Sequence, residues 1–135
     1  MHVEAYVYFK GNCEQAFEFY KAALGGELSL NRYEGTPRES HVSAADKSKI
    51  LHASLRFESG AAIMGADAVG EWKHTVGNNI ALSLATNDES EAKRSFEKLA
   101  AGGKVEMPLA PTFWGAKLFG MLVDKFGVQW LISCH

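Results

Sequence analysis

The histidine best placed to do chemistry, His52, lies in a segment whose residues alternate between apolar and polar. In residues 50–57, "ILHASLRF", the polar positions are His52, Ser54 and Arg56. Alternate side chains of a β-strand point to opposite faces, so we expect His52 to point away from the core. An imidazole there could act as a general acid or base, or orient a carbonyl or phosphonate oxygen. It could equally be a hydrogen-bonded histidine that only helps to close a pocket.

Three further side chains each have one chemical and one structural interpretation. Cys13 lies where a helix is predicted to begin, and a helix N-terminus can stabilise a thiolate, although packing of the thiol explains its position as well. Asp67 could pair with His52 or cap a turn. Trp114 could form the aromatic wall of a pocket or pack at a contact between subunits. The remaining histidines lie in predicted termini or loops and share no metal-ligand spacing; they are His2, His41, His74 and His135.

The composition is typical of a globular protein and excludes several classes of function. The chain of 135 residues has a net charge of −2, with 47% hydrophobic and 22% charged residues. It contains no basic stripe, so we expect no nucleic-acid binding. No apolar run approaches the roughly 20 residues that span a bilayer, and the N-terminus lacks the pattern of a signal peptide, so we expect no membrane association. Two cysteines without CxxC spacing favour a cytoplasmic protein with reduced thiols.

The elements that position these residues follow a pattern that occurs twice. "FYKAALGGEL" at residues 19–28 returns as "FEKLAAGGKV" at residues 96–105. In both copies an apolar helical stripe is followed by two glycines, which supply the positive φ of a helix C-terminus. The helices are predicted to begin at Asn12, with Gln15 completing a capping box, and at Asp88.

Each half is predicted to run strand, helix and three strands, which indicates a duplication. Segments rich in β-branched and aromatic residues predict the strands. They are residues 3–9, 27–33, 50–57 and 61–67 in the first half, and 78–86, 105–109, 117–124 and 128–134 in the second. Residues 34–49 are long for a structureless loop, which predicts either a flap or a short helix. We therefore expect a first module at residues 1–67, a linker at 68–77 and a second module at 78–135, within one structural domain.

Several motifs in this order resemble the vicinal oxygen chelate superfamily, the glyoxalase, bleomycin-resistance and dioxygenase group, and within it the PhnB-like branch. The motifs are "GNCEQAFEFYKAALGGE", "LHASLRF" with "AAIMGAD", "NNIALSL" and "DKFGVQWLIS", with "FWG" between the last two. The resemblance implies an α+β fold in which two βαβββ modules curl a mixed sheet into a cup, with the helices outside and a ligand inside. It also implies a homodimer.

The resemblance further points to four cup positions that hold a divalent ion in metal-dependent members, usually through His and Glu. In this chain Ala5, Met64, Asn79 and Leu131 match them. A catalytic zinc, iron or nickel ion needs imidazole, carboxylate or thiolate ligands, which none of the four supplies. We therefore expect no metal at these positions and no cofactor. The methyltransferase activity attached to some PhnB-like proteins is not expected either, because no glycine-rich loop for S-adenosylmethionine follows a strand.

A mostly apolar cup with a few fixed polar groups is typical of a site for a small organic molecule. The residues expected to line it are Val7, Phe9, Ser54, Met64, Asn79, Ser83, Trp114, Gln129 and Leu131, together with His52. The favoured function is binding of a small aromatic or amphipathic molecule. The alternative is a metal-independent or atypical-metal enzyme, of lyase or isomerase type, that acts on a carbonyl or phosphonate-like molecule with His52 as acid or base. Whether the protein is an enzyme stays open on the sequence.

Overall fold

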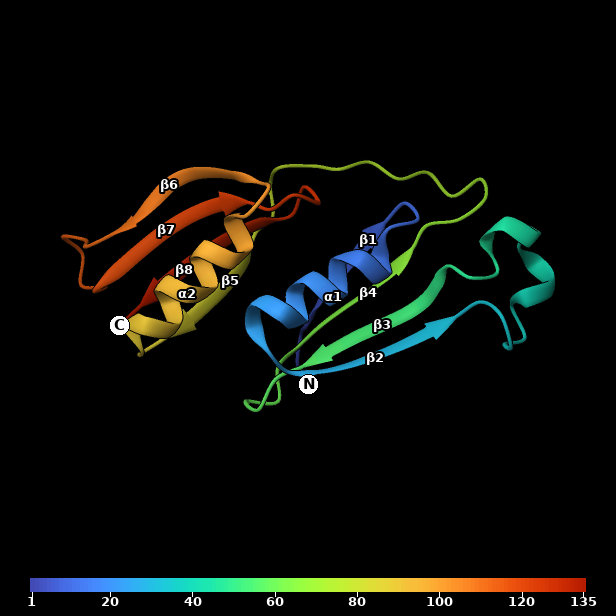
Figure 1. The fold of residues 1–135 in the computed structure, drawn as a ribbon, viewed down its shortest axis with the longest axis horizontal. Coiled ribbons are helices and arrows are strands. Elements are labelled where there is room, and N and C mark those ends of the chain that lie inside the picture. Colours follow the sequence, from blue (N-terminus) through green and yellow to red (C-terminus); the bar gives the residue numbers. More distant parts are fainter. The chain divides into compact units, whose positions relative to one another are not determined.

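The computed structural model describes all residues, 1–135, and divides into two compact units, Met1–Thr75 and Val76–His135. Each unit contains one α-helix and a four-stranded mixed sheet, so the predicted α+β class is confirmed (Figure 1). The division between the units falls inside the segment 68–77 that was predicted to be a linker. Neither helix is long and apolar enough to cross a membrane.

The first unit follows the predicted order of strand, helix and three strands. Its elements are β1 (Ala5–Phe9), α1 (Cys13–Leu24), β2 (Glu27–Arg32), β3 (Ile50–Arg56) and β4 (Ala62–Asp67). The strands lie in the order β1-β4-β3-β2, with β1 parallel to β4 and the other neighbours antiparallel. Residues 34–49 contain two short 3-10 helices, Glu39–His41 and Ala44–Asp46, which agrees with the short-helix alternative.

Helix α1 covers one face of the first sheet, and its apolar stripe supplies much of the core of this unit (Figure 1). Phe17 and Tyr20 are fully buried there, as is Leu55 of β3. Burial of each such side chain stabilises the fold by about 1.5–3 kcal/mol. A Cβ on Gly65 of β4 would lie 2.5 Å from the carbonyl oxygen of Val7 on β1 and 2.8 Å from the ring of Phe17 on α1. Glycine is therefore needed at this position.

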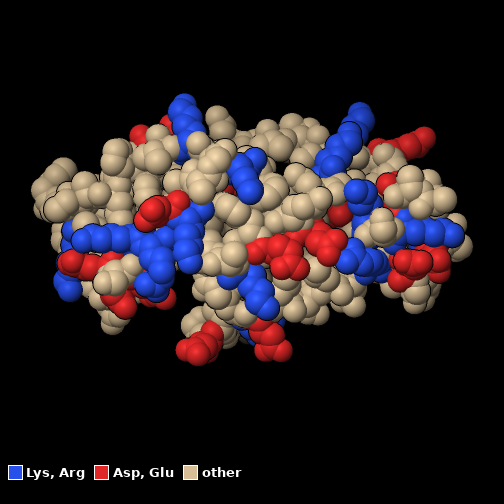
Figure 2. Space-filling view, viewed as in Figure 1, with Lys and Arg blue, Asp and Glu red and all other residues tan.

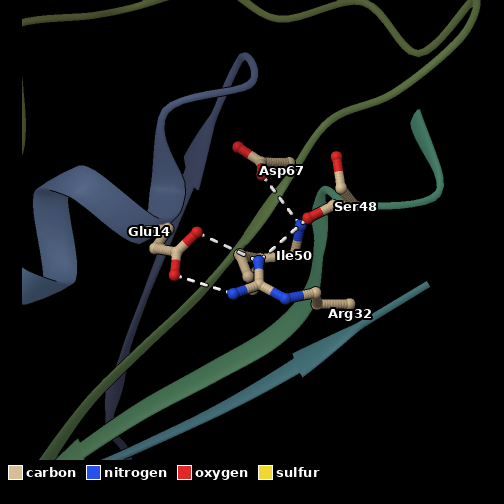
Figure 3. Close-up of polar contacts among 5 residues, drawn as sticks. All are labelled: Glu14, Arg32, Ser48, Ile50 and Asp67. Atoms are coloured by element: carbon tan, nitrogen blue, oxygen red, sulfur yellow. Dashed lines mark hydrogen bonds and ion pairs between the residues drawn. The ribbon is translucent and has the colours of Figure 1, made fainter. Parts of the chain in front are cut away.

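The start of α1 differs from the predicted capping box. Asn12 makes no side-chain hydrogen bond to the helix. Instead, one carboxylate oxygen of Asp67 accepts hydrogen bonds from the backbone N–H groups of Gly11 at 2.9 Å and Cys13 at 3.0 Å. The other oxygen accepts from the N–H of Ile50 at 2.9 Å (Figure 3). Asp67 is buried, so its charge is stabilised by these donors and by the positive end of the helix.

The second unit repeats the plan of the first. Its elements are β5 (Leu82–Thr86), α2 (Glu89–Ala100), β6 (Lys104–Ala110), β7 (Leu118–Val123) and β8 (Gln129–Cys134). The strand order β5-β8-β7-β6 matches that of the first sheet, with β5 parallel to β8. Asp88 caps α2 as predicted, because its carboxylate accepts from the N–H groups of Ser90 and Glu91. Strand β5 begins at Leu82 instead of residue 78, which leaves Asn79 outside the strand.

Candidate functional site

The face of the first sheet that lies opposite α1 carries the best candidate site. Residues that pair across neighbouring strands point to the same face, so the register fixes which side chains meet there. This face, called here the open face, consists of two rows across the strands: Tyr6, Met64, Ser54 and Ser29 in one, and Tyr8, Ala66, His52 and Asn31 in the other. His52, Ser54 and Met64 therefore point away from α1.

Tyr6 and His52 form a hydrogen-bonded pair on the open face, although they are 46 residues apart in the chain. The Tyr6 hydroxyl lies 3.0 Å from His52 Nδ1, and the two rings are tilted against each other with centroids 5.6 Å apart. Burial, with smaller contributions from Tyr8, Cys13 and Tyr33, raises the pKa of the Tyr6 phenol above its ordinary value of 10.0. The phenol is therefore protonated at neutral pH and keeps a proton to donate.

Aromatic rings continue from this pair along the edge strand. The Tyr6 and Tyr8 ring centroids lie 5.2 Å apart, and Trp72 packs on Tyr8 with centroids 4.8 Å apart. Each of the three rings stays substantially exposed, at 40% for Tyr6, 45% for Tyr8 and 49% for Trp72. His74 Nε2 lies 3.0 Å from the Tyr8 carbonyl oxygen, which holds the Trp72 segment against β1. A contiguous exposed aromatic surface of this kind is typical of an interaction site.

The faces predicted for the first strand are wrong by one residue. Val7 pairs with Gly65, which contacts α1, and the Phe9 ring lies 6.1 Å from that of Phe17. Val7 and Phe9 therefore face α1. Tyr6 and Tyr8 lie on the open face, where Val7 and Phe9 were expected. The reason is that every residue of "AYVYF" is apolar or aromatic, so alternation alone could not tell the two faces apart.

Sequence reasoning therefore missed Tyr6, Tyr8 and Trp72. The only signal that could have found the two tyrosines is their phenolic hydroxyls, which favour the wetter face of a strand whose other residues lack polar atoms. Trp72 lies in the segment 68–77, which has no periodicity, and nothing local indicates its contact with Tyr8.

The open face of the second sheet brings together the candidates from that half. Ser83 pairs with Leu131, and Leu131 pairs with Met121. Trp114 lies beside them, because its ring packs on Phe119 of β7 with centroids 5.5 Å apart. Gln129 begins β8 and reaches the Ile80 carbonyl through Nε2 at 3.4 Å. Asn79 precedes β5 and is not part of this sheet face.

Neither sheet supplies a set of metal ligands at the four positions where metal-dependent relatives would have them. The register pairs Met64 with Tyr6 instead of Ala5, and Leu131 with Ser83 instead of Asn79. Tyr6 and Ser83 offer hydroxyls where imidazole or carboxylate would be needed, and leucine has no donor atom. Across residues 1–135, no three His, Cys, Asp or Glu side chains lie close enough to hold an ion. These residues therefore do not fit a catalytic metal.

Two of the alternatives left open by the sequence are resolved by hydrogen bonds and burial. Asp67 neither pairs with His52 nor caps a turn at the start of segment 68–77, because its carboxylate oxygens accept from the backbone at the starts of α1 and β3. Cys13 is fully buried, and burial, reinforced by the negative charges of Asp67 and Glu14, raises the pKa of its thiol to about 12. A nucleophilic thiolate is not formed there at neutral pH.

An ion pair next to α1 fixes strand β2 against the helix. Arg32 donates from Nη1 to Glu14 Oε1 at 3.0 Å and from Nη2 to Oε2 at 2.8 Å (Figure 3). Arg32 Nη1 also donates to the Ser48 carbonyl oxygen at 3.0 Å. These hydrogen bonds hold the pKa of Glu14 below its ordinary value. The pair lies on the helix side of the sheet, so we assign it a structural role.

On the face of the molecule that Figure 2 shows, charged residues do not gather into a patch of one sign. Lys and Arg are interspersed with Asp and Glu over the face visible in Figure 2, and no basic stripe crosses it. A protein that binds a phosphate backbone usually concentrates its positive charge on one face or along one helix.

Comparison with known proteins places the chain among relatives of the same length. The family model described as 3-demethylubiquinone-9 3-methyltransferase matches residues 2–133. Protein YjdN of Escherichia coli K12 is 36% identical over 142 residues, which cover 98% of this chain and 95% of YjdN. The crystal structure of protein PA1353 from Pseudomonas aeruginosa is 38% identical with a TM-score of 0.89, and the match covers 100% of this chain and 98% of PA1353.

Two further structures connect the fold to named groups. A PhnB protein from Bacillus cereus, described as a 3-demethylubiquinone-9 3-methyltransferase, is 25% identical with a TM-score of 0.78, over 100% of both chains. A glyoxalase-related enzyme from Fulvimarina pelagi matches with a TM-score of 0.63 at 18% identity, over 100% of this chain and 89% of that one. The last similarity is one of fold alone, and it agrees with the predicted glyoxalase-like arrangement.

Proposed function

Because the chain belongs to the 3-demethylubiquinone-9 3-methyltransferase family, in the PhnB-like branch of the vicinal oxygen chelate proteins, we propose that it binds a small aromatic or amphipathic molecule. The observation that carries this proposal is the row of exposed, mutually contacting rings of Tyr6, Tyr8 and Trp72 on the open face of the first sheet. Stacking on such rings contributes about 0.5–1.5 kcal/mol per ring pair beyond the area that it buries. His52 and Ser54 supply polar groups beside the rings, which would orient the ligand.

The methyl transfer in the family's name does not fit the residues of this chain. A methyltransferase needs a site for S-adenosylmethionine, commonly where a glycine-rich loop joins a strand to a helix N-terminus. Here the Cys13 N–H at the start of α1 is already bonded to Asp67, and the N–H groups at the start of α2 are bonded to Asp88. A carboxylate therefore occupies both helix N-termini, and a cofactor would have to displace a buried one at α1.

Ligand binding is tested by thermal-shift screening of aromatic and amphipathic compounds, followed by titration under native mass spectrometry. Trp72 and Trp114 are exposed whereas Trp130 is buried, so binding at the open faces should also change tryptophan fluorescence. We expect Trp72→Ala to weaken binding, because it removes one ring of the aromatic surface. Phe19→Leu, on helix α1, is the matched control and should leave binding unchanged. Failure of every compound class to stabilise the protein would contradict the proposal.

A second candidate function is favoured by the Tyr6–His52 hydrogen bond. A phenol and an imidazole 3.0 Å apart could pass a proton to and from a bound carbonyl or phosphonate-like molecule, in a lyase or isomerase reaction. His52 would be the acid or base, and no metal would be required at the four family positions. If this is correct, His52→Ala abolishes turnover of a substrate without abolishing its binding. An unchanged rate in that variant would exclude His52 as the catalytic residue.

A further inference from the structure

We infer that the open face of the first sheet selects uncharged, planar aromatic molecules that carry a carbonyl oxygen. Tyr6, Tyr8 and Trp72 would hold the ring system, and His52 would donate a hydrogen bond from Nε2 to the oxygen. This inference rests on the proposed function and adds to it the chemical class of the ligand.

The first step is the tautomer of His52. The Tyr6 hydroxyl and His52 Nδ1 are 3.0 Å apart, so one of them donates to the other. A phenol is a much stronger acid than a neutral imidazole N–H, and an imidazole nitrogen is a better acceptor than a phenol oxygen. The Tyr6 O–H therefore donates to Nδ1. A neutral imidazole whose Nδ1 accepts carries its proton on Nε2, which is then a donor.

The second step is what Nε2 can bind. The only hydrogen bond of the His52 ring within the chain is the one to Tyr6, so the Nε2 donor is left to solvent or to a ligand. The half-buried ring lies on the same sheet face as the exposed aromatic rings. A ligand atom at Nε2 must accept a hydrogen bond, which is the role of a carbonyl oxygen.

The third step is charge. The eight residues in the two rows of the open face include no Lys, Arg, Asp or Glu, and the next row of the same face contains one charge of each sign, Arg56 opposite Glu27. Arg56 is already engaged, because its Nη1 donates to the Gly60 carbonyl oxygen at 2.8 Å and lies 3.7 Å from Glu4 Oε1. A phosphonate or carboxylate would therefore lose part of its hydration without gaining a free cation, which weakens its binding. A neutral carbonyl carries no charge, so it binds without this loss of ion hydration.

The fourth step is the distribution of polarity across the sheet. The rings of the two tyrosines lie on β1. The polar groups lie on the far strands: the His52 imidazole and the Ser54 hydroxyl on β3, and the Ser29 hydroxyl and the Asn31 amide on β2. Strands β1 and β3 are two strand spacings apart, about 10 Å. A flat molecule with a ring at one end and an uncharged oxygen at the other matches this change from aromatic to polar.

Three naphthalene probes test the inference by isothermal titration calorimetry at pH 7.5. 2-Acetonaphthone carries the carbonyl, 2-isopropenylnaphthalene replaces its oxygen with a methylene group of similar shape, and 2-naphthylphosphonate is an anion. We expect the ketone to bind about 3- to 10-fold more tightly than the alkene, the value of one hydrogen bond, and the phosphonate to bind most weakly. Equal binding of ketone and alkene, or tighter binding of the phosphonate, would overturn the inference while leaving the proposed binding function intact. If no probe binds, the inference fails, and the thermal-shift screen of the other compound classes decides whether the binding function fails with it.

Two variants locate the effect. His52→Leu should reduce the affinity for the ketone to that of the alkene and leave the alkene unchanged, whereas the exposed His41→Leu is the control and should change neither. Tyr6→Phe keeps the ring but removes the hydroxyl that fixes the tautomer, so it should weaken only the ketone. Loss of affinity for both probes in His52→Leu would assign this residue a packing role and contradict the inference.

The tautomer itself is measurable without any ligand. Two-bond 1H–15N correlation spectra of 15N-histidine-labelled protein distinguish the protonated from the unprotonated ring nitrogen of His52. We expect Nε2 to carry the proton in the wild type, and a mixture of tautomers in Tyr6→Phe. A proton on Nδ1 in the wild type would refute the first step and the inference with it.

Discussion

Replacing Asp67 with alanine should destabilise the first unit more than any single surface change. The carboxylate accepts hydrogen bonds from the N–H groups of Gly11, Cys13 and Ile50 at 2.9, 3.0 and 2.9 Å, and its side chain is only 1% exposed. A buried donor left without a partner costs about 1–3 kcal/mol, and water can reach some of the space that the carboxylate leaves. We therefore expect a loss of about 3–5 kcal/mol, a large part of the 5–15 kcal/mol that typically stabilises a domain.

The control for this prediction is the N-cap of helix α2 in the second unit. Asp88 also caps a helix with its carboxylate, but its bonds to Ser90 and Glu91 are exposed, so water replaces them when the side chain is removed. Asp88→Ala should therefore cost only about 1 kcal/mol. The loss of stability in Asp67→Asn should lie between those of the two alanine variants. Its amide oxygen can still accept from Gly11 and Cys13, but its NH2 group would face the N–H of Ile50.

The assay is urea unfolding followed by circular dichroism, with hydrogen-exchange mass spectrometry to assign the loss to residues 1–75 or 76–135. We expect faster exchange at the starts of α1 and β3 in Asp67→Ala and unchanged protection in the second unit. If Asp67→Ala and Asp88→Ala lose the same free energy of unfolding within about 0.5 kcal/mol, which is the usual scatter of such measurements, the assigned role of Asp67 is wrong.

Three further predictions follow from packing and ionisation. The Cys13 thiol should resist Ellman's reagent in native protein and react only after unfolding. Its pKa is about 12 in the fold and 9.0 when unperturbed, so the stabilisation that comes from burying the neutral thiol should be complete below pH 9 and lost as the pH rises toward 12. Glu14→Gln should cost no more than about 1 kcal/mol at pH 7, because its pair with Arg32 is half-exposed, and the difference from wild type in urea unfolding should disappear as the pH falls below 4.5. Gly65→Ala should cost about 3 kcal/mol or more in the same assay, because the new Cβ would lie 2.5 Å from the Val7 carbonyl oxygen, and a cost below 1 kcal/mol would show that β1 can move aside.

The order of elements could be predicted from the sequence because its signals are local. The apolar stripe of each helix, the two glycines after it and the alternation in residues 50–57 all act within a few positions, and the structure confirms the βαβββ order twice. The cap of α2 was also predicted, since Asp88 and its partners are neighbours in the chain.

The features that were predicted wrongly depend on residues far apart in the chain. Asp67 caps α1 across more than 50 positions and replaces the local box that Asn12 and Gln15 were expected to form. The face of β1 is set by its pairing with β4, through Gly65, and the sequence of β1 indicates it only through the two tyrosine hydroxyls, because its residues do not alternate between apolar and polar. The Tyr6–His52 contact, which defines the candidate site, follows from the same pairing.

The contact between His74 and the Tyr8 carbonyl has a consequence for how the molecule behaves in concentrated solution. β1 is the outermost strand of its sheet, and Tyr8 turns its carbonyl away from β4, where another chain could add a strand of its own. His74 already occupies that carbonyl oxygen and Trp72 packs on the Tyr8 ring, so we expect this stretch to hinder the pairing of another chain with β1. Shortening this stretch would expose the edge strand β1 and favour aggregation, even if both units still folded.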